Sequence, residues 1–131
     1  MIKPTEVIAG VSRLLKRIKK AKIMELESKK CVPCQGGIPP LTLAEAQNYL
    51  KETPKWSLSE TGDRLRCSFS FDDFDAALAF VNEVGRLAED EGHHPEITFG
   101  WGYADIEIYT HKIQGLHEND FILAAKIDSL R

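Results

Sequence analysis

"LRCSFSFDDFDAALAFVNEVGRLAEDEGHHPEITF", residues 65–99, changes its hydrophobic period twice and so predicts the order of the central elements. Leu65, Cys67 and Phe69 alternate with polar residues, which is the pattern of a half-buried strand. From about Asp72 the apolar residues recur three and four positions apart, as they do on one face of a helix. The predicted buried face of this helix comprises Phe74, Ala77, Leu78, Val81 and Ala88.

The predicted helix ends at Gly92, because glycine readily adopts the left-handed conformation that closes many helices. Pro95 then disfavours further helix and directs the chain into an extended segment. After Pro95 the alternation of apolar and polar residues returns and predicts a strand that ends in a short turn near Ala104. The predicted strand carries Ile97, Phe99, Trp101 and Tyr103 on one face.

The flanking residues supply the remaining elements. A capping-box pattern opens a predicted helix over residues 42–53, and a strand begins at residues 56–58 and returns through the turn "ETGD". Residues 105–111 predict the last strand and residues 118–130 the last helix. The order α-β-β-α-β-β-α predicts an α+β fold, a four-stranded antiparallel sheet with helices packed on one face. We assign this domain to residues 41–131.

The first thirty residues differ from the rest in charge. Residues 1–30 hold nine Lys and Arg against three Asp and Glu, whereas residues 31–131 hold eight against seventeen. We expect residues 1–30 to form a basic amphipathic helical extension and residues 31–40 a Pro/Gly linker. The extension could dock on the body or on another subunit, lie on a membrane surface, contact nucleic acid or fray, and the docked and frayed forms are favoured.

Composition excludes several classes of protein. The acidic balance of residues 31–131 argues against a nucleic-acid-coating domain, and no run of about 18 apolar residues predicts a membrane span. The N-terminus lacks the pattern of a secretory signal. Three cysteines are too few for a disulfide framework, so we expect a cytoplasmic protein.

Four polar residues are candidates for acid–base chemistry. His93 and His94 follow the helix stop, His111 ends the last strand, and Asp120 opens the last helix on its apolar face. Histidine both donates and accepts a proton near neutral pH, and Glu89 lies one helical turn before His93. The residues alone leave alternatives open, because histidines can cap a helix end and Asp120 can serve the helix dipole.

The cysteines offer a weaker signal. Cys31 and Cys34 form a C-x-x-C pair, but no second such pair or spaced histidine pair completes a zinc site. The pair also lies in a Pro/Gly linker rather than after a strand, where a redox motif is expected. We therefore predict no metal, and we expect Cys67 to be a core residue.

Together these residues resemble the pterin-4a-carbinolamine dehydratase family. The resemblance rests on Glu89, His93-His94-Pro95, Trp101, His111 in "THK" and Asp120 at the family's spacing, and it spans about residues 41–130. It implies a lyase that removes water from a 4a-hydroxytetrahydropterin to give quinonoid dihydropterin, with no cofactor and no metal. A proline-rich "CVPC" lead-in resembles some bacterial members.

The resemblance also implies a role for each site residue. His93 and His111 would form the acid–base pair, and His94 would position the substrate and support catalysis. Asp120 would orient a histidine, and Glu89 would support the site. Trp101 would contact the pterin, and the backbone at Thr110 would read its amide edge.

The partners follow from the same resemblance. We expect a pterin substrate, a homodimer or homotetramer, and a functional link to an aromatic amino acid hydroxylase that produces the substrate. Two alternatives stay open: an oligomeric interaction module resembling a transcriptional coactivator, and a related role in molybdopterin metabolism.

Overall fold

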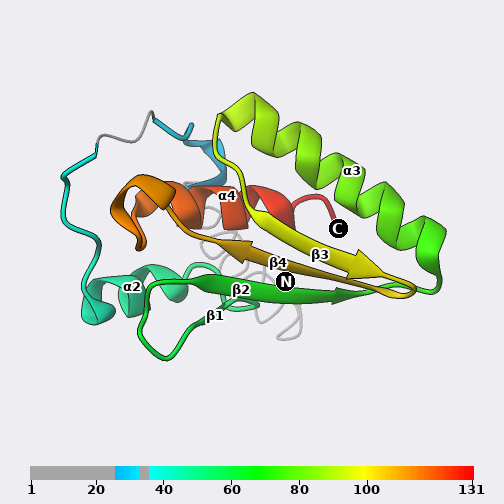
Figure 1. Cartoon of the computed structure of the whole chain (residues 1–131), viewed down its shortest axis with the longest axis horizontal. Coiled ribbons are helices and arrows are strands. Elements are labelled where there is room, and N and C mark those ends of the chain that lie inside the picture. The colour runs from blue at the N-terminus through cyan, green and yellow to red at the C-terminus, as the bar shows by residue number, and fades with distance from the viewer. Residues whose placement is uncertain (1–25, 33–35) are drawn as a thin grey trace, which may run out of the picture.

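The structure, a computed structural model, describes residues 26–32 and 36–131. Most of the predicted basic extension, together with Cys34, lies outside these residues. A four-stranded antiparallel sheet forms the front layer in Figure 1, in the order β1-β2-β4-β3. Its strands are β1 (Ser57–Leu58), β2 (Leu65–Ser70), β3 (Glu96–Gly100) and β4 (Tyr103–Ile108).

The helices cover one face of this sheet. They are α2 (Leu43–Leu50), α3 (Phe74–Glu91) and α4 (Glu118–Asp128), with a short 3-10 helix η1 (His111–Ile113) between β4 and α4. Helix α3 packs against β3, β4 and α4, and α2 packs against α4 and β1. The predicted α+β fold, with its four antiparallel strands and one helical layer, is confirmed.

Strand register explains why only one face is covered. Leu65 pairs with Ile108, Cys67 with Ile106 and Phe69 with Ala104, and all six side chains are buried. Alternation sends the residues between them to the opposite, open face, where β2 presents Arg66, Ser68 and Ser70 to solvent.

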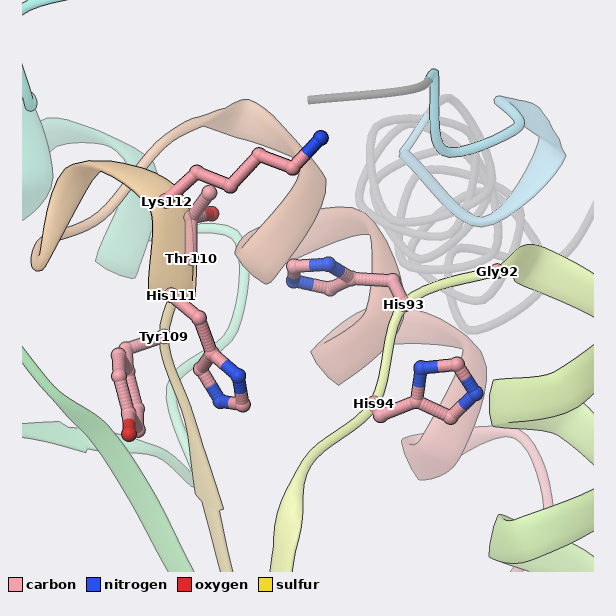
Figure 2. A pocket seen from close by; sticks show the side chains of 7 residues that line it. All are labelled: Gly92, His93, His94, Tyr109, Thr110, His111 and Lys112. Atoms are coloured by element: carbon pink, nitrogen blue, oxygen red, sulfur yellow. The ribbon is translucent and has the colours of Figure 1, made fainter. Parts of the chain in front are cut away.

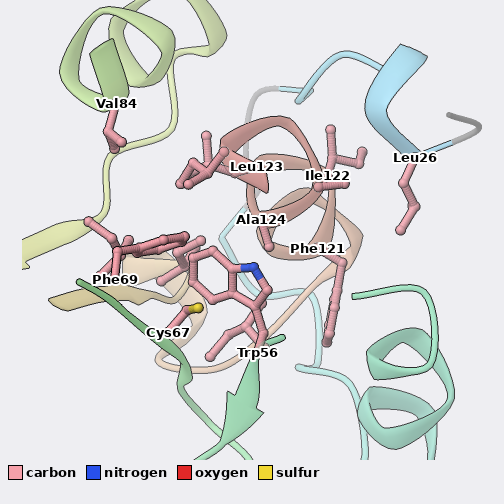
Figure 3. Packing of buried hydrophobic residues seen from close by; sticks show 14 of the residues in the cluster. Leu26, Trp56, Cys67, Phe69, Val84, Phe121, Ile122, Leu123 and Ala124 are labelled. Atoms are coloured by element: carbon pink, nitrogen blue, oxygen red, sulfur yellow. The ribbon is translucent and has the colours of Figure 1, made fainter. Parts of the chain in front are cut away.

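Helix α4 is the centre of the core. Residues 119–125 and Ile127 are all buried, so this helix is enclosed on every side instead of presenting one apolar stripe. Figure 3 shows how residues from the hairpin, α3 and the N-terminal lead-in surround it, and its labelled members are Leu26, Trp56, Cys67, Phe69, Val84, Phe121, Ile122, Leu123 and Ala124. Because Asn119 and Asp120 belong to this helix, two polar side chains are carried into the interior.

The caps follow the sequence closely. The predicted capping box at Thr42 and Glu45 is present, with Thr42 Oγ1 accepting from the Glu45 N–H at 3.2 Å. Asp73 caps α3 by accepting from the Ala76 N–H at 2.8 Å. Gly92 closes α3 with φ +63°, in the left-handed region predicted for it.

Two expectations are wrong in detail. Phe74 was expected in the core but is 47% exposed at the first turn of α3, where its ring packs at 5.6 Å from the ring of Phe99. Helix α3 buries Phe80 and Val84 in its place.

The turn of the second hairpin also lies earlier than predicted. Strand β3 ends at Gly100, Trp101 and Gly102 form the turn, and Tyr103 already belongs to β4. Gly102 has φ +82°, a conformation that favours glycine, so the local signal for the turn was this residue. No helix among the described residues is long and apolar enough to cross a membrane.

Candidate active site

His93 follows the C-terminal end of α3 directly. The N–H groups of Gly92 and His93 bond back to carbonyls of the last helical turn, His93 to the Ala88 carbonyl at 3.1 Å. This closure fixes where the chain leaves the helix and turns the His93 side chain toward α4. That side chain is only 11% exposed, and its Nε2 lies 2.6 Å from Oδ1 of Asp120.

Asp120 is completely buried and surrounded by donors. Its Oδ2 accepts the hydroxyl of Thr110 at 2.8 Å and the backbone N–H of His117 at 2.8 Å. Oδ1 is left for His93. Asp120 was expected either to serve the dipole of the last helix or to orient a histidine. The structure combines the two, because one oxygen accepts a hydrogen bond at the start of α4 while the other contacts the His93 imidazole.

This arrangement determines the tautomer of His93. An ionised carboxylate can only accept hydrogen bonds, so the contact between Nε2 and Oδ1 requires Nε2 to carry a hydrogen and to donate it. A neutral His93 therefore carries its hydrogen on Nε2 and has Nδ1 available as a proton acceptor. A buried carboxylate on one nitrogen also stabilises the imidazolium that forms when the other nitrogen takes a proton, as in serine hydrolases.

His94 points the other way. Its Nε2 lies 2.6 Å from Oε1 of Glu89 on α3, and both side chains are exposed, at 58% and 77%. Figure 2 shows His94 turned toward α3, while His93 and His111 project from opposite sides toward the same space. Glu89 therefore contacts His94 and not His93 in the described chain.

His111 begins η1, just after β4, and is also exposed. Its ring lies 4.3 Å from the Tyr109 ring, and Tyr109 in turn carries the guanidinium of Arg64 at 3.6 Å from its centroid. His111 Nε2 is 3.7 Å from a carboxylate oxygen of Glu96 on β3. Aromatic packing and a nearby carboxylate thus hold this second imidazole at the mouth of the site.

These side chains border one pocket of about 290 Å³. That volume is at the lower end of the range for small-molecule sites, enough for a compact heterocycle. Figure 2 shows its lining, which comprises Gly92, His93, His94, Tyr109, Thr110, His111 and Lys112. Two histidines distant in sequence, His93 and His111, therefore face one opening that His94 also lines, beside a buried carboxylate.

Two predicted substrate-contacting residues have unexpected positions. Thr110 lines the pocket, but its hydroxyl donates to Asp120, its N–H to the Gly115 carbonyl, and its own carbonyl accepts from Ile113. Trp101 is 72% exposed in the β3–β4 turn. The five residues of β3, about 17 Å of extended chain, separate it from the end of β3 that follows the pocket-lining residues His93 and His94.

Tyr109 and Lys112 were not predicted, although both line the pocket. They flank Thr110 and His111, so the sequence signal for them was simply adjacency to a predicted site residue. Asn119, only 4% exposed next to Asp120, was also missed.

Cys31 and Cys67 lie outside the pocket lining. Cys67 is buried in the core, as predicted. Burial first, and then the neighbouring Glu91 carboxylate, raise the pKa of the Cys31 thiol to about 12. Within residues 26–32 and 36–131, no three His, Cys, Asp or Glu side chains are grouped as metal ligands.

The fold and site define a small α+β protein with a carboxylate-bound histidine in a polar pocket. The sequence matches the family described as pterin 4 alpha carbinolamine dehydratase over residues 39–130. A relative from Azoarcus sp. (strain BH72), named "Putative pterin-4-alpha-carbinolamine dehydratase", is 55% identical over 106 residues, 81% of this chain and 91% of its own. This chain belongs to the pterin 4 alpha carbinolamine dehydratase family.

Solved structures agree with this assignment. The crystal structure of a transcriptional coactivator/pterin dehydratase from Brucella melitensis matches with a TM-score of 0.65 at 28% identity, covering 70% of this chain and 97% of that one. A pterin dehydratase-like protein, identified as a RuBisCO assembly factor in the alpha-carboxysome, matches with a TM-score of 0.51 at 27% identity and covers 58% and 88%.

Similarity to the Azoarcus relative extends beyond the family match. A single aligned stretch of 106 residues within a chain of 131 has to begin at residue 26 or earlier. The family match begins at residue 39. The lead-in over residues 26–38 is thus part of what this chain shares with that relative.

Proposed function

We propose that this protein is a dehydratase that removes water from a 4a-hydroxytetrahydropterin and releases quinonoid dihydropterin. The observation that supports it most strongly is the His93–Asp120 contact of 2.6 Å on the wall of a pocket that His111 also borders. Family membership names the substrate class. The residues supply the acid and base that this reaction requires.

The reaction needs two proton transfers and no change in oxidation state. The 4a-hydroxyl must gain a proton as its C–O bond breaks, since hydroxide is a poor leaving group, and a ring N–H must lose one. One imidazole donates, the other accepts, and water and the quinonoid product leave with no net proton change. His93 and His111 supply the two imidazoles, and Asp120 holds His93 in the tautomer that presents Nδ1.

The remaining predicted residues take supporting roles. We propose that Thr110 acts by fixing Asp120, since its polar groups already bond within the protein. His94 would contact the pterin from the side of α3, with Glu89 holding its ring. The proposed contact between Trp101 and the pterin stays a prediction, as does the cytoplasmic location.

The direct test is turnover. The purified full-length chain is expected to accelerate loss of water from a freshly generated carbinolamine, followed by the absorbance of the quinonoid product. His111→Ala is expected to lower kcat by on the order of 100-fold, the usual contribution of a general acid or base. A wild-type protein that binds the pterin but gives only the spontaneous rate would favour a binding module, the second candidate that the names of the two solved neighbours suggest.

We also propose a homo-oligomer, as the family resemblance implies. Strand β3 is an edge of the sheet, and three large aromatic side chains are exposed near the tip of its hairpin: Phe74, Trp101 and Tyr103. Such surface favours association with another chain. Light scattering of the full-length protein should give at least twice the monomer mass of 14.7 kDa, and a monomer at micromolar concentration would contradict the proposal.

A further inference from the structure

The lead-in segment crosses the two helix ends that carry the His93–Asp120 pair. In Figure 1 the residues just before the linker lie beside the N-terminal end of α4 and the C-terminal end of α3. We call residues 29–32 the strap. Three of its four residues, Lys29, Cys31 and Val32, make hydrogen bonds with those two helix ends.

The first contact is with α3. The backbone N–H of Cys31 donates to Oε2 of Glu91 at 2.9 Å, and Glu91 also pairs with Lys126 of α4. Burial raises the pKa of Glu91, but hydrogen bonds from Lys126 and Cys31 outweigh it and hold that pKa below its usual value. Glu91 is therefore an anion at neutral pH, and only Gly92 separates it from His93.

The second contact is with α4 through Asn119. Its Oδ1 accepts the Val32 N–H at 3.1 Å, and its Nδ2 donates to the Val32 carbonyl at 2.7 Å. The amide therefore satisfies both backbone groups of one strap residue, as a neighbouring strand would. Cys31 Sγ also donates to the Asn119 carbonyl at 3.6 Å. Asn119 is 4% exposed and immediately precedes Asp120.

We propose that the strap positions the catalytic pair His93 and Asp120, a proposal that rests on the proposed function. Asn119 is the positioning residue through which the strap acts on Asp120. The strap joins the residue two before His93 to the residue one before Asp120. It thereby fixes the separation of the two helix ends across which the 2.6 Å contact is made. A catalytic group moved by about 1 Å can lose on the order of 100-fold in rate, so such bracing matters.

The same contacts give a structural role to Cys31 and Val32, the described residues of the "CVPC" lead-in. Cys31 is partly buried, and its Sγ donates a hydrogen bond instead of offering a thiolate. The residue serves as a packed donor in the strap. The relative from Azoarcus shares this lead-in region, whereas the family match starts after it.

The test compares Asn119→Ala with Asn48→Ala, a matched change at an exposed position of α2. Asn119→Ala is expected to lower kcat about tenfold with KM within about twofold, because the residues lining the pocket are unchanged. Asn48→Ala should leave both constants unchanged. Urea unfolding of each variant shows that the measured protein is folded.

A second readout does not depend on turnover. A strongly hydrogen-bonded imidazole proton resonates far downfield, so NMR should detect Nε2–H of His93, assigned by its loss in His93→Gln. We expect that signal to broaden or vanish in Asn119→Ala and to persist in Asn48→Ala. If Asn119→Ala kept wild-type kcat and an unchanged signal, the strap inference would be overturned while the proposed function stood.

The remaining outcomes separate the two proposals. If the wild-type protein were inactive but its His93 signal still depended on Asn119, the proposed function would be rejected. The inference that the strap positions His93 and Asp120 would be retained. A variant that is less stable but retains kcat and the signal would give Asn119 a purely structural role and overturn the inference. If Asn119→Ala does not fold, Asn119→Asp, which keeps the acceptor for Val32 N–H but loses the donor, is subjected to the same two measurements.

Discussion

At the scale of single residues, Asp120 has the largest expected effect among the residues that do not line the pocket. It is completely buried, accepts from Thr110 and His117 through one oxygen, and contacts His93 through the other. An amide at this position would keep the two acceptor contacts with its oxygen and would turn its NH₂ toward His93. His93 would then have to accept on Nε2 and carry its hydrogen on Nδ1.

Asp120→Asn is therefore expected to lower kcat by on the order of 100-fold, because the tautomer that presents Nδ1 as acceptor is lost. The measurement is the dehydration rate at saturating substrate, with a urea titration to verify folding. A variant within twofold of wild type would show that Asp120 only caps α4.

Cys31 gives a prediction about pH. With a thiol pKa of about 12 instead of 9.0, about one thiol in ten thousand is ionised at pH 8, compared with about one in ten at the ordinary value. Iodoacetamide reacts with the thiolate, so Cys31 in the native protein should be alkylated far more slowly than free cysteine, and faster as the pH rises. Peptide mass spectrometry measures this. Labelling at the rate of free cysteine would show that the strap does not bury the thiol.

Single residues also show the limits of the sequence. The inward position of Asp120 could be predicted, since it shares a helical face with Leu123 and Ile127. Its set of three donors could not, because His93 follows α3, Thr110 follows β4 and His117 precedes α4, and only the fold brings these together. Trp101 lies in a tight hairpin at the other end of β3, and its contact with the pterin, implied by the family resemblance, stays a prediction.

At the scale of elements, the end of α3 determines where both adjacent histidines point. Gly92 adopts φ +63°, and apart from the adjoining chain no atom would lie within 4 Å of a Cβ added there. The cost of a side chain at this position is therefore conformational and not steric.

Gly92→Ala is expected to lower the free energy of unfolding by about 1 kcal/mol, measured by urea titration. Gly85→Ala is the matched control, because Gly85 lies within α3, has ordinary helical φ and also has open space around its Cβ. That control should raise stability by about 0.5–1 kcal/mol. Equal effects of the two changes would contradict the left-handed cap.

The helices and strands could be predicted where capping residues agree with the hydrophobic periodicity, and less well where only the periodicity was available. Thr42 and Gly92 mark real helix ends, and the alternation of β2 gives its buried face correctly. The alternation of apolar and polar residues alone predicted that the strand continues through Trp101 and Gly102, because a two-residue turn interrupts this alternation too briefly to be detected. Phe74 fits the period of α3 but is exposed at its first turn.

At the scale of the whole molecule, the chain divides into the domain that matches the family and a lead-in segment that packs against this domain. The family match covers residues 39–130, yet Leu26 is 2% exposed in the core and the strap bonds to both α3 and α4. The sequence predicted a linker over residues 31–40 from its proline and glycine content. Composition could not show that residues 31 and 32 dock, since their partners lie 60 to 88 positions away.

Two truncations test this division. A chain starting at Leu26 keeps the strap and should retain kcat within about twofold. A chain starting at Pro39 loses the strap and the burial of Leu26, and should lose about 1.5–3 kcal/mol of stability and about tenfold in kcat. If the shorter chain equalled the longer in both measurements, the lead-in would have no part in the site.

The central claim is that His93, held by Asp120, carries out proton transfer on a pterin carbinolamine in this pocket. The most direct measurement is the stopped-flow rate of carbinolamine dehydration with wild-type protein and with His93→Ala, both verified as folded. We predict acceleration well above the spontaneous rate for wild type and a loss on the order of 100-fold or more for the variant. Equal rates for the two proteins would contradict the claim.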